Sequence, residues 1–241
     1  MASPPASTSG QHRYGLVLLL TIVAVIDVIV APDTPTSRGI GLLLQGATLL
    51  AVIATSREER TIRRLASILA GIVFLVLAAG VASSVLPRWV SAAVAGGAVL
   101  TVLVVLVRGV GRMVRDRGVS LQAVAGALAI YMLVGLTFAF MVSVIAYVGP
   151  KYFAQPGHAS AGEGAYFALS EEVYFSFTTM TTTGYGDLTP ATNVGHALAV
   201  LEMLIGQIYL VTVIGLLVGN LNRRPAGSPE SGRGVPGRSG T

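Results

Sequence analysis

Residues 178–187 read Thr-Thr-Met-Thr-Thr-Thr-Gly-Tyr-Gly-Asp, a run of threonines followed by two glycines that flank a tyrosine. In an ordinary β-strand, successive residues point to opposite sides, and their carbonyl groups alternate as well. Turning several consecutive carbonyls to one side requires residues with positive φ, a conformation that glycine adopts at little steric cost. Gly184 and Gly186 can supply those positions. A one-sided row of carbonyl oxygens can replace the water around a cation.

The composition is that of an integral membrane protein. Of the 241 residues, 53% are hydrophobic and only 11% are charged, and the mean hydropathy is +0.74. Soluble domains carry about 25% charged residues. The net charge of +5 comes from basic residues that lie between apolar segments, so it indicates membrane topology and not a nucleic-acid surface. The absence of cysteine excludes disulfides and thiolate metal sites.

Six apolar segments are long enough to cross a membrane, for which roughly 17–25 residues are needed. We therefore expect an all-α polytopic fold in which a re-entrant loop, residues 170–190, dips between the fifth and sixth segments. The six segments are approximately 14–31, 39–55, 65–86, 89–107, 121–148 and 194–221.

The basic residues predict the orientation, because cytoplasmic loops carry an excess of Lys and Arg. With the N-terminus in the cytoplasm, all 16 basic residues lie inside except Arg38, Arg88 and Lys151. We therefore expect a multi-pass protein of the plasma membrane with both termini cytoplasmic and residues 170–190 on the extracellular side. Arg13 before an apolar run could instead begin a signal peptide, but Asp27 interrupts that run.

Residues 121–221 resemble the helix–pore loop–helix module of prokaryotic potassium channels. The resemblance rests on the order Thr-Thr-Gly-Tyr-Gly-Asp at 182–187, followed by Pro190, Gly195 and Gly206 at the family's spacing. It implies passive conduction of K⁺, whose hydration shell is replaced by backbone carbonyls of a selectivity filter. One filter strand cannot surround an ion, so the resemblance also implies a homotetramer with closed symmetry.

The resemblance implies roles for individual residues. K⁺ would be coordinated by the filter residues Thr182, Thr183, Gly184, Tyr185 and Gly186, the first four holding the ion. Support for the filter is expected from Asp187, Thr178, Phe175 and Glu202, and a gating hinge from Gly206. The cavity would be lined by Gln207, Leu210, Ile214 and Val218, although the same helical stripe is also consistent with ordinary packing.

Two kinds of contact are expected around the filter. The Tyr185 ring should brace the filter against nearby aromatic residues such as Tyr174 and Phe175. Glu202 is a carboxylate inside an apolar run, and such groups usually face protein or water because exposure to lipid is costly. We expect Glu202 to accept hydrogen bonds from the pore helix, for example from Thr178 or Thr179; the alternative is that it is protonated and only structural. Where the best-known bacterial channels have a glutamate and a tryptophan, this chain has Thr178 and Phe175.

Six segments with a pore loop before the last one are also the plan of voltage-gated channels. A voltage sensor needs several arginines within the membrane, and residues 89–107 contain no charged residue. Arg108, Arg112 and Arg115 share one helical face but follow the apolar span, so we expect them to reach lipid headgroups. Steep voltage gating is therefore not expected.

The domain organisation predicted from these observations has five parts. They are a disordered N-terminus (1–13), a four-helix membrane domain without an assigned role (14–107), a cytoplasmic linker (108–120), the pore domain (121–221) and a disordered tail (222–241). The partners expected are membrane lipid and three further copies of the chain, with no nucleic acid, no cofactor besides the permeant K⁺ and no enzymatic activity. The alternatives are a potassium transporter subunit, whose pore loops are usually four and degenerate, and a non-conducting modulatory subunit.

Overall fold

The computed structural model describes residues 13–30, 88–149, 152–154 and 169–221, together with isolated helical residues at 46, 48, 68, 71, 72, 74 and 75. The predicted second and third segments therefore lie outside the described residues apart from those isolated positions. The predicted disordered tail at 222–241 and all but the last residue of the predicted N-terminal segment 1–13 also lie outside them.

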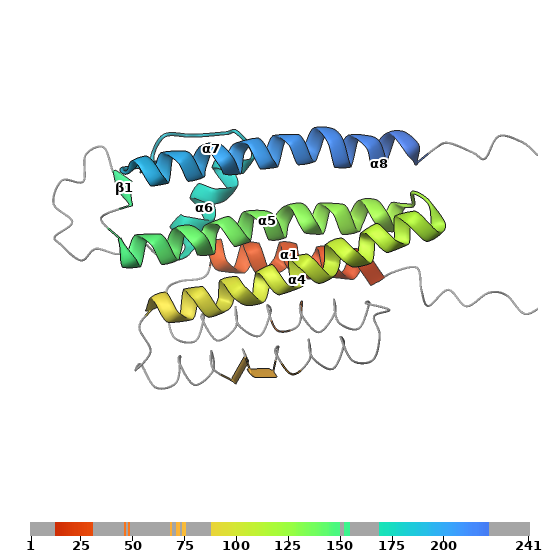
Figure 1. Cartoon of the computed structure of the whole chain (residues 1–241), viewed down its shortest axis with the longest axis horizontal. Coiled ribbons are helices and arrows are strands. Elements are labelled where there is room, and N and C mark those ends of the chain that lie inside the picture. Colours follow the sequence, from red (N-terminus) through yellow and green to blue (C-terminus); the bar gives the residue numbers. More distant parts are fainter. Residues whose placement is uncertain are drawn as a thin grey trace, which may run out of the picture.

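The described part is mostly helical. Helices α1 (Arg13–Val30), α4 (Arg88–Arg117) and α5 (Leu121–Val148) lie side by side, and α7 (Asn193–Ile208) runs along another side of α5 (Figure 1). The short helix α6 (Leu169–Met180) lies between α5 and α7 at one end of the bundle. Val17, Leu106, Leu136 and Val173 belong to one continuous core that joins α1, α4, α5 and α6.

Three of the described helical stretches are long and apolar enough to cross a membrane: Ala92–Asp116, Leu121–Val148 and Asn193–Asn220. A shorter apolar helix covers Tyr14–Val30. These bounds confirm the predicted fourth, fifth and sixth segments as helices, while the total of six spans stays a prediction. Within the single chain, 61% of the α5 span is buried but only 11% of the last span, so the last span presents most of its surface to lipid or to other chains.

Helix α4 extends further than the apolar pattern indicates. Helix α4 continues without a break to Arg117, through most of the predicted cytoplasmic linker at 108–120, and residues 118–120 form the turn. Arginine is a good helix former, and Gly109 and Gly111, which disfavour a helix by about 1 kcal/mol each, do not end it. The cytoplasmic location of this linker stays a prediction. Ser120 then caps α5, accepting a hydrogen bond from the Ala123 amide at 3.3 Å.

A pair of two-residue strands joins the two ends of the segment between α5 and α7. Strand β1 (Phe153–Ala154) pairs antiparallel with β2 (Thr189–Pro190), with Phe153 opposite Pro190. The amide of Ala191 also donates to the Tyr152 carbonyl at 2.6 Å. This small sheet, which the all-α prediction does not include, ties the segment after α5 to the segment that leaves the loop 181–187.

The predicted final helix changes its winding part-way. Between α7 and α8 (Gly215–Asn220) lies η2 (Tyr209–Ile214), a π-helical segment in which each turn holds nearly one residue more than an α-turn. At its start, the Tyr209 hydroxyl donates to the Ala127 carbonyl of α5 at 2.8 Å. Ile214 is half-buried and packs against a cluster formed by Ala123 and Ala127 of α5 and Leu217 of α8. The π-helical segment changes the spacing of the predicted stripe, and the role of Ile214 as a cavity residue stays a prediction.

Candidate functional site

Helix α6 ends inside the stretch of residues 178–187. Glu171 and Glu172 lie in its first turn, where the helix dipole favours negative charge. The helix ends at Met180, and residues 181–187 leave it in an irregular conformation. All seven of these residues are exposed in the single chain. We call them the filter loop.

The sign of φ alternates along the filter loop. Thr182, Gly184 and Gly186 have φ of 59°, 50° and 81°, whereas Thr183 and Tyr185 do not have positive φ. The predicted positive φ at both glycines is confirmed. Thr182 was not predicted, and in the described chain it alone has positive φ without being glycine. This conformation is strained for a β-branched residue, and such strain concentrates at functional sites.

Backbone hydrogen bonds hold one side of the filter loop against the end of α6. Three consecutive amides, those of residues 182–184, donate to the carbonyls of Thr178 and Thr179. The distances are 2.9 Å for Thr182 to Thr179, 2.8 Å for Thr183 to Thr178 and 3.1 Å for Gly184 to Thr178. In a trans peptide the carbonyl points opposite to the following amide, and the described bonds include no cis peptide. The carbonyls of residues 181–183 therefore all point away from α6.

The threonine hydroxyls divide between the two sides of the loop. Thr181 donates to the Phe177 carbonyl at 2.6 Å and lies 2.9 Å from the Thr183 hydroxyl, so both side chains are on the α6 side. The Thr182 hydroxyl donates to the Thr181 carbonyl at 2.7 Å and so joins the row of carbonyls. Thr178 supports the loop through its carbonyl, while its hydroxyl bonds to the Phe175 carbonyl of its own helix at 3.0 Å.

Tyr174 braces the far end of the filter loop. Its ring stacks on that of Tyr185, with centroids 6.2 Å apart and planes inclined by 3°. Its hydroxyl donates to Oδ2 of Asp187 at 2.8 Å, and this hydrogen bond raises the pKa of Tyr174. Oδ1 of Asp187 accepts from the Leu188 amide at 3.0 Å. The predicted contact between Tyr185 and Tyr174 is confirmed, and Tyr174 is also the partner of Asp187, which the sequence analysis did not predict.

Phe175 takes a different place from the one predicted. Its buried ring meets those of Phe153 and Tyr152 nearly at right angles, with centroids 5.0 and 6.3 Å away. Consecutive residues on a helix point about 100° apart, so Phe175 cannot share the face of Tyr174. The prediction that Phe175 also braces Tyr185 is therefore corrected: Phe175 packs α6 against the segment around β1.

Helix α7 covers α6 with residues spaced four apart. Glu202 is fully buried and forms a short hydrogen bond with Ser176, so its predicted partners Thr178 and Thr179 are corrected to Ser176. A Cβ on Gly206 would lie 2.5 Å from the Met180 carbonyl oxygen, so α7 touches the end of α6 with no room for a side chain. This contact is a packing reason for glycine at 206; its role as a hinge stays a prediction.

Gln207 is the predicted cavity residue that reaches the filter loop. Its Nε2 lies 3.3 Å from Oγ1 of Thr182. Leu210 is half-buried and Val218 is 54% exposed, and their roles as cavity residues stay predictions. Among the described residues, no group of three or more His, Asp or Glu side chains could hold a metal ion. The oxygens that the loop gathers are carbonyls and hydroxyls, which suit a weakly held cation.

A second buried carboxyl group, that of Glu172, lies on α6, and burial changes its pKa. Glu172 is 2% exposed, and burial raises its pKa to about 8, opposed by a hydrogen bond from Ser143 and assisted by the charge of Glu171. The group is therefore largely neutral over a pH range in which an exposed glutamate is charged.

Residues 141–222, about a third of the chain, match a family model described as an ion channel. This part of the chain is similar to ion channel domains. The match covers the last turns of α5, all of α6, the filter loop and the last span. The match and the three long apolar helices indicate that the chain is a membrane protein.

A curated relative matches a segment of the chain that is 69 residues long. Two pore potassium channel c of Oryza sativa subsp. japonica is 33% identical over 69 residues, which are 29% of this chain and 15% of that protein. The chain therefore spans only a small part of that relative, and the similarity concerns a segment and not the whole protein.

Proposed function

We propose that four copies of this chain form a potassium-selective channel, with one filter loop from each copy around a central axis. The observation that carries the proposal is the alternating sign of φ along residues 182–186, which turns consecutive carbonyls to the side away from α6. Such oxygens can replace the water shell of K⁺. The name of the rice relative, a potassium channel, supports the choice of ion.

The need for several copies follows from the exposure of the loop. Residues 181–187 are backed by α6 on one side, and all seven are exposed in the single chain, although Gln207 reaches the Thr182 hydroxyl. One strand cannot surround an ion, whereas a closed ring of identical strands can. The largely exposed last span supplies further surface for contacts between copies. We place both termini in the cytoplasm and the filter loop near the extracellular side of the plasma membrane, as the distribution of basic residues favours.

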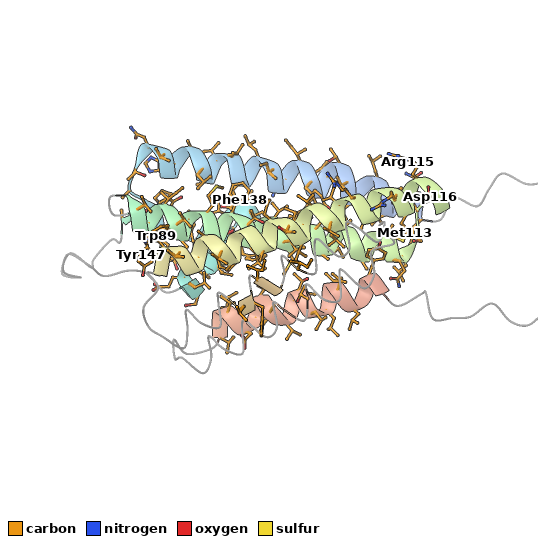
Figure 2. The ribbon with its side chains drawn as sticks, turned by 60° about the horizontal axis from the view of Figure 1, so that its bottom comes forward. Trp89, Met113, Arg115, Asp116, Phe138 and Tyr147 are labelled. Atoms are coloured by element: carbon orange, nitrogen blue, oxygen red, sulfur yellow. The ribbon has the colours of Figure 1, made fainter. Side chains whose placement is uncertain are left out.

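The channel should respond only weakly to voltage. Trp89 and Arg115 lie at opposite ends of α4 (Figure 2). At 1.5 Å per residue, Trp89 and Arg108 are about 28 Å apart along the axis, close to the roughly 30 Å of membrane hydrocarbon. No charged residue lies between them. Arg108, Arg112 and Arg115 are exposed and follow the apolar part, where headgroups can solvate them.

The test is a bilayer recording of the purified full-length protein with K⁺ on one side and Na⁺ on the other. We expect discrete current steps and a reversal potential displaced strongly toward that of K⁺. A reversal potential near zero would refute selectivity, and tetramers that carry no current would refute the channel. Flux without discrete steps would favour a transporter subunit.

One variant tests the filter itself. Gly184→Ala should abolish selective current, because a Cβ at positive φ costs ~1–2 kcal/mol in each strand. Gly97→Ala is the control, since a Cβ there meets nothing within 4 Å. Selective current from Gly184→Ala would mean that the loop does not act as the filter.

A further inference from the structure

Gln207 and Thr182 form a contact between the last span and the filter loop. The amide nitrogen Nε2 of Gln207 lies 3.3 Å from Oγ1 of Thr182. The single proton of the Thr182 hydroxyl is already donated to the Thr181 carbonyl at 2.7 Å. The hydroxyl can therefore only accept from Gln207, which also determines which end of the Gln207 amide faces the loop.

The polar side chain of Gln207 is unusual in its surroundings. The neighbouring residues of the helix, Leu204, Ile205 and Ile208, are apolar and exposed in the single chain. The Gln207 side chain is half-buried, and its amide carries two donors. Thr182 is a partner that satisfies one of its donors, and Gly206 holds this turn of α7 against the Met180 carbonyl, so the position of Gln207 relative to the loop is well defined.

We propose that Gln207 is a positioning residue for the innermost cation site of the filter loop. A hydroxyl oxygen has one proton and two lone pairs. In Thr182 the proton goes to Thr181 and one lone pair to Gln207, so the other lone pair is held in a constant direction beside the carbonyls. Without Gln207 the Thr182 hydroxyl keeps only its hydrogen bond to the Thr181 carbonyl, and its oxygen is less well oriented toward an ion. The inference rests on the proposed function and assigns a residue to the same site.

The experiment measures block by Ba²⁺ applied from the cytoplasmic side to the full-length channel in bilayers. Ba²⁺ is close to K⁺ in size and binds more strongly to the same oxygens, so its affinity reports on the innermost site. Gln207→Met keeps the length of the side chain and removes the donor. We expect it to weaken block by about tenfold, which corresponds to about 1.4 kcal/mol of binding free energy, because the four Thr182 oxygens are then less well oriented toward the ion. Ile208→Met is the matched control and should leave block unchanged.

A second pair of variants separates positioning from a general change in the helix. Thr182→Val removes the hydroxyl at nearly constant shape. If Gln207 acts through that hydroxyl, Gln207→Met should have no further effect on block in the Thr182→Val background. An effect of equal size in both backgrounds would overturn the proposal. Tetramer melting is measured for every variant. A loss of tetramers that accounts for the change in block would overturn the proposal too.

The outcomes distinguish this inference from the proposed function. No K⁺ current from wild-type tetramers overturns both. A selective K⁺ current with Ba²⁺ block that Gln207→Met leaves unchanged overturns the role of Gln207 alone. If Gln207→Met does not assemble, Gln207→Asn provides the same test, because it stays polar but is one carbon too short to reach Thr182. Normal block in an assembled Gln207→Asn channel would equally refute the role.

Discussion

Ser176 of α6 and Glu202 of α7 are joined by a buried hydrogen bond at the contact between these two helices. The Ser176 hydroxyl also lies 2.7 Å from the Gly135 carbonyl of α5. A hydroxyl has one proton, and a carbonyl can only accept, so both contacts are satisfied together when Glu202 carries a proton and donates it to Ser176. The other oxygen of Glu202, Oε2, is buried without a partner in the described chain, which an ionised carboxylate would tolerate poorly. We infer that Glu202 is neutral in this structure.

The first prediction concerns the charge of Glu202. Glu202→Gln should retain wild-type current and thermal stability at pH 7, because the amide can donate to Ser176 as a neutral carboxyl does. Glu202→Ala should lower the free energy of unfolding by about 1–3 kcal/mol per chain, since it removes a buried partner. Bilayer recording and melting of the detergent-solubilised tetramer measure both effects. Equal damage from the two substitutions would indicate that the negative charge is what matters.

The second prediction distinguishes packing from hinge motion at Gly206. Replacing glycine by alanine inside a helix ordinarily stabilises it by up to ~1 kcal/mol. Gly206→Ala should instead lower the melting temperature of the tetramer and reduce current, because its Cβ would overlap the Met180 carbonyl. Gly219→Ala, where a Cβ meets nothing within 4 Å, is the control. A Gly206→Ala tetramer that is more stable but gates poorly would instead favour the hinge.

The third prediction concerns which residues of the last span face the conduction path. The chain has no cysteine, so single cysteines can be labelled without background. Val211 is one turn beyond Gln207 and 72% exposed, and Val211→Cys should react with a membrane-impermeant thiol reagent added on the cytoplasmic side. Ile214→Cys should be protected by Ala123 and Ala127 of α5. The reverse pattern would mean that the π-helical segment winds as an ordinary α-helix in the membrane.

The fourth prediction concerns stability and pH. The pKa of Glu172 is raised from its ordinary value of 4.5 to about 8, so between these values the folded protein binds a proton that the unfolded chain has released. The resulting stability is complete below about pH 4.5 and is lost as the pH rises toward 8. The melting temperature of the solubilised protein should therefore fall as the pH rises across this range, and Glu172→Gln should remove much of that decline.

Glu171→Gln is the control for the fourth prediction, because it removes one negative charge from the same helix turn. It should leave most of the slope in place, since burial is the larger cause of the shift at Glu172. A slope that Glu172→Gln does not change would show that another group binds the proton.

Several features of the fold could be predicted from local properties of the sequence. The apolar runs predict three spans that the structure describes, because the length of a membrane helix is set by hydrocarbon thickness. The positive φ of Gly184 and Gly186 follows from the low steric cost of that conformation for glycine. The stacking of Tyr185 on Tyr174 was also predicted, since both lie close together in the sequence.

Other features were decided only when the helices packed. The partner of Glu202 is Ser176 and not Thr178 or Thr179, because the rotation of α6 relative to α7 determines which side chain faces the carboxyl group. The same rotation directs Phe175 toward Phe153 and away from Tyr185. Thr182 has positive φ although its side chain disfavours it, because three hydrogen bonds to the end of α6 impose the alternation. Residue preferences act locally, whereas the contacts of Glu202 and Phe175 depend on how separate elements are placed relative to one another. At Thr182, hydrogen bonds to the end of α6 outweigh the preference of the residue itself.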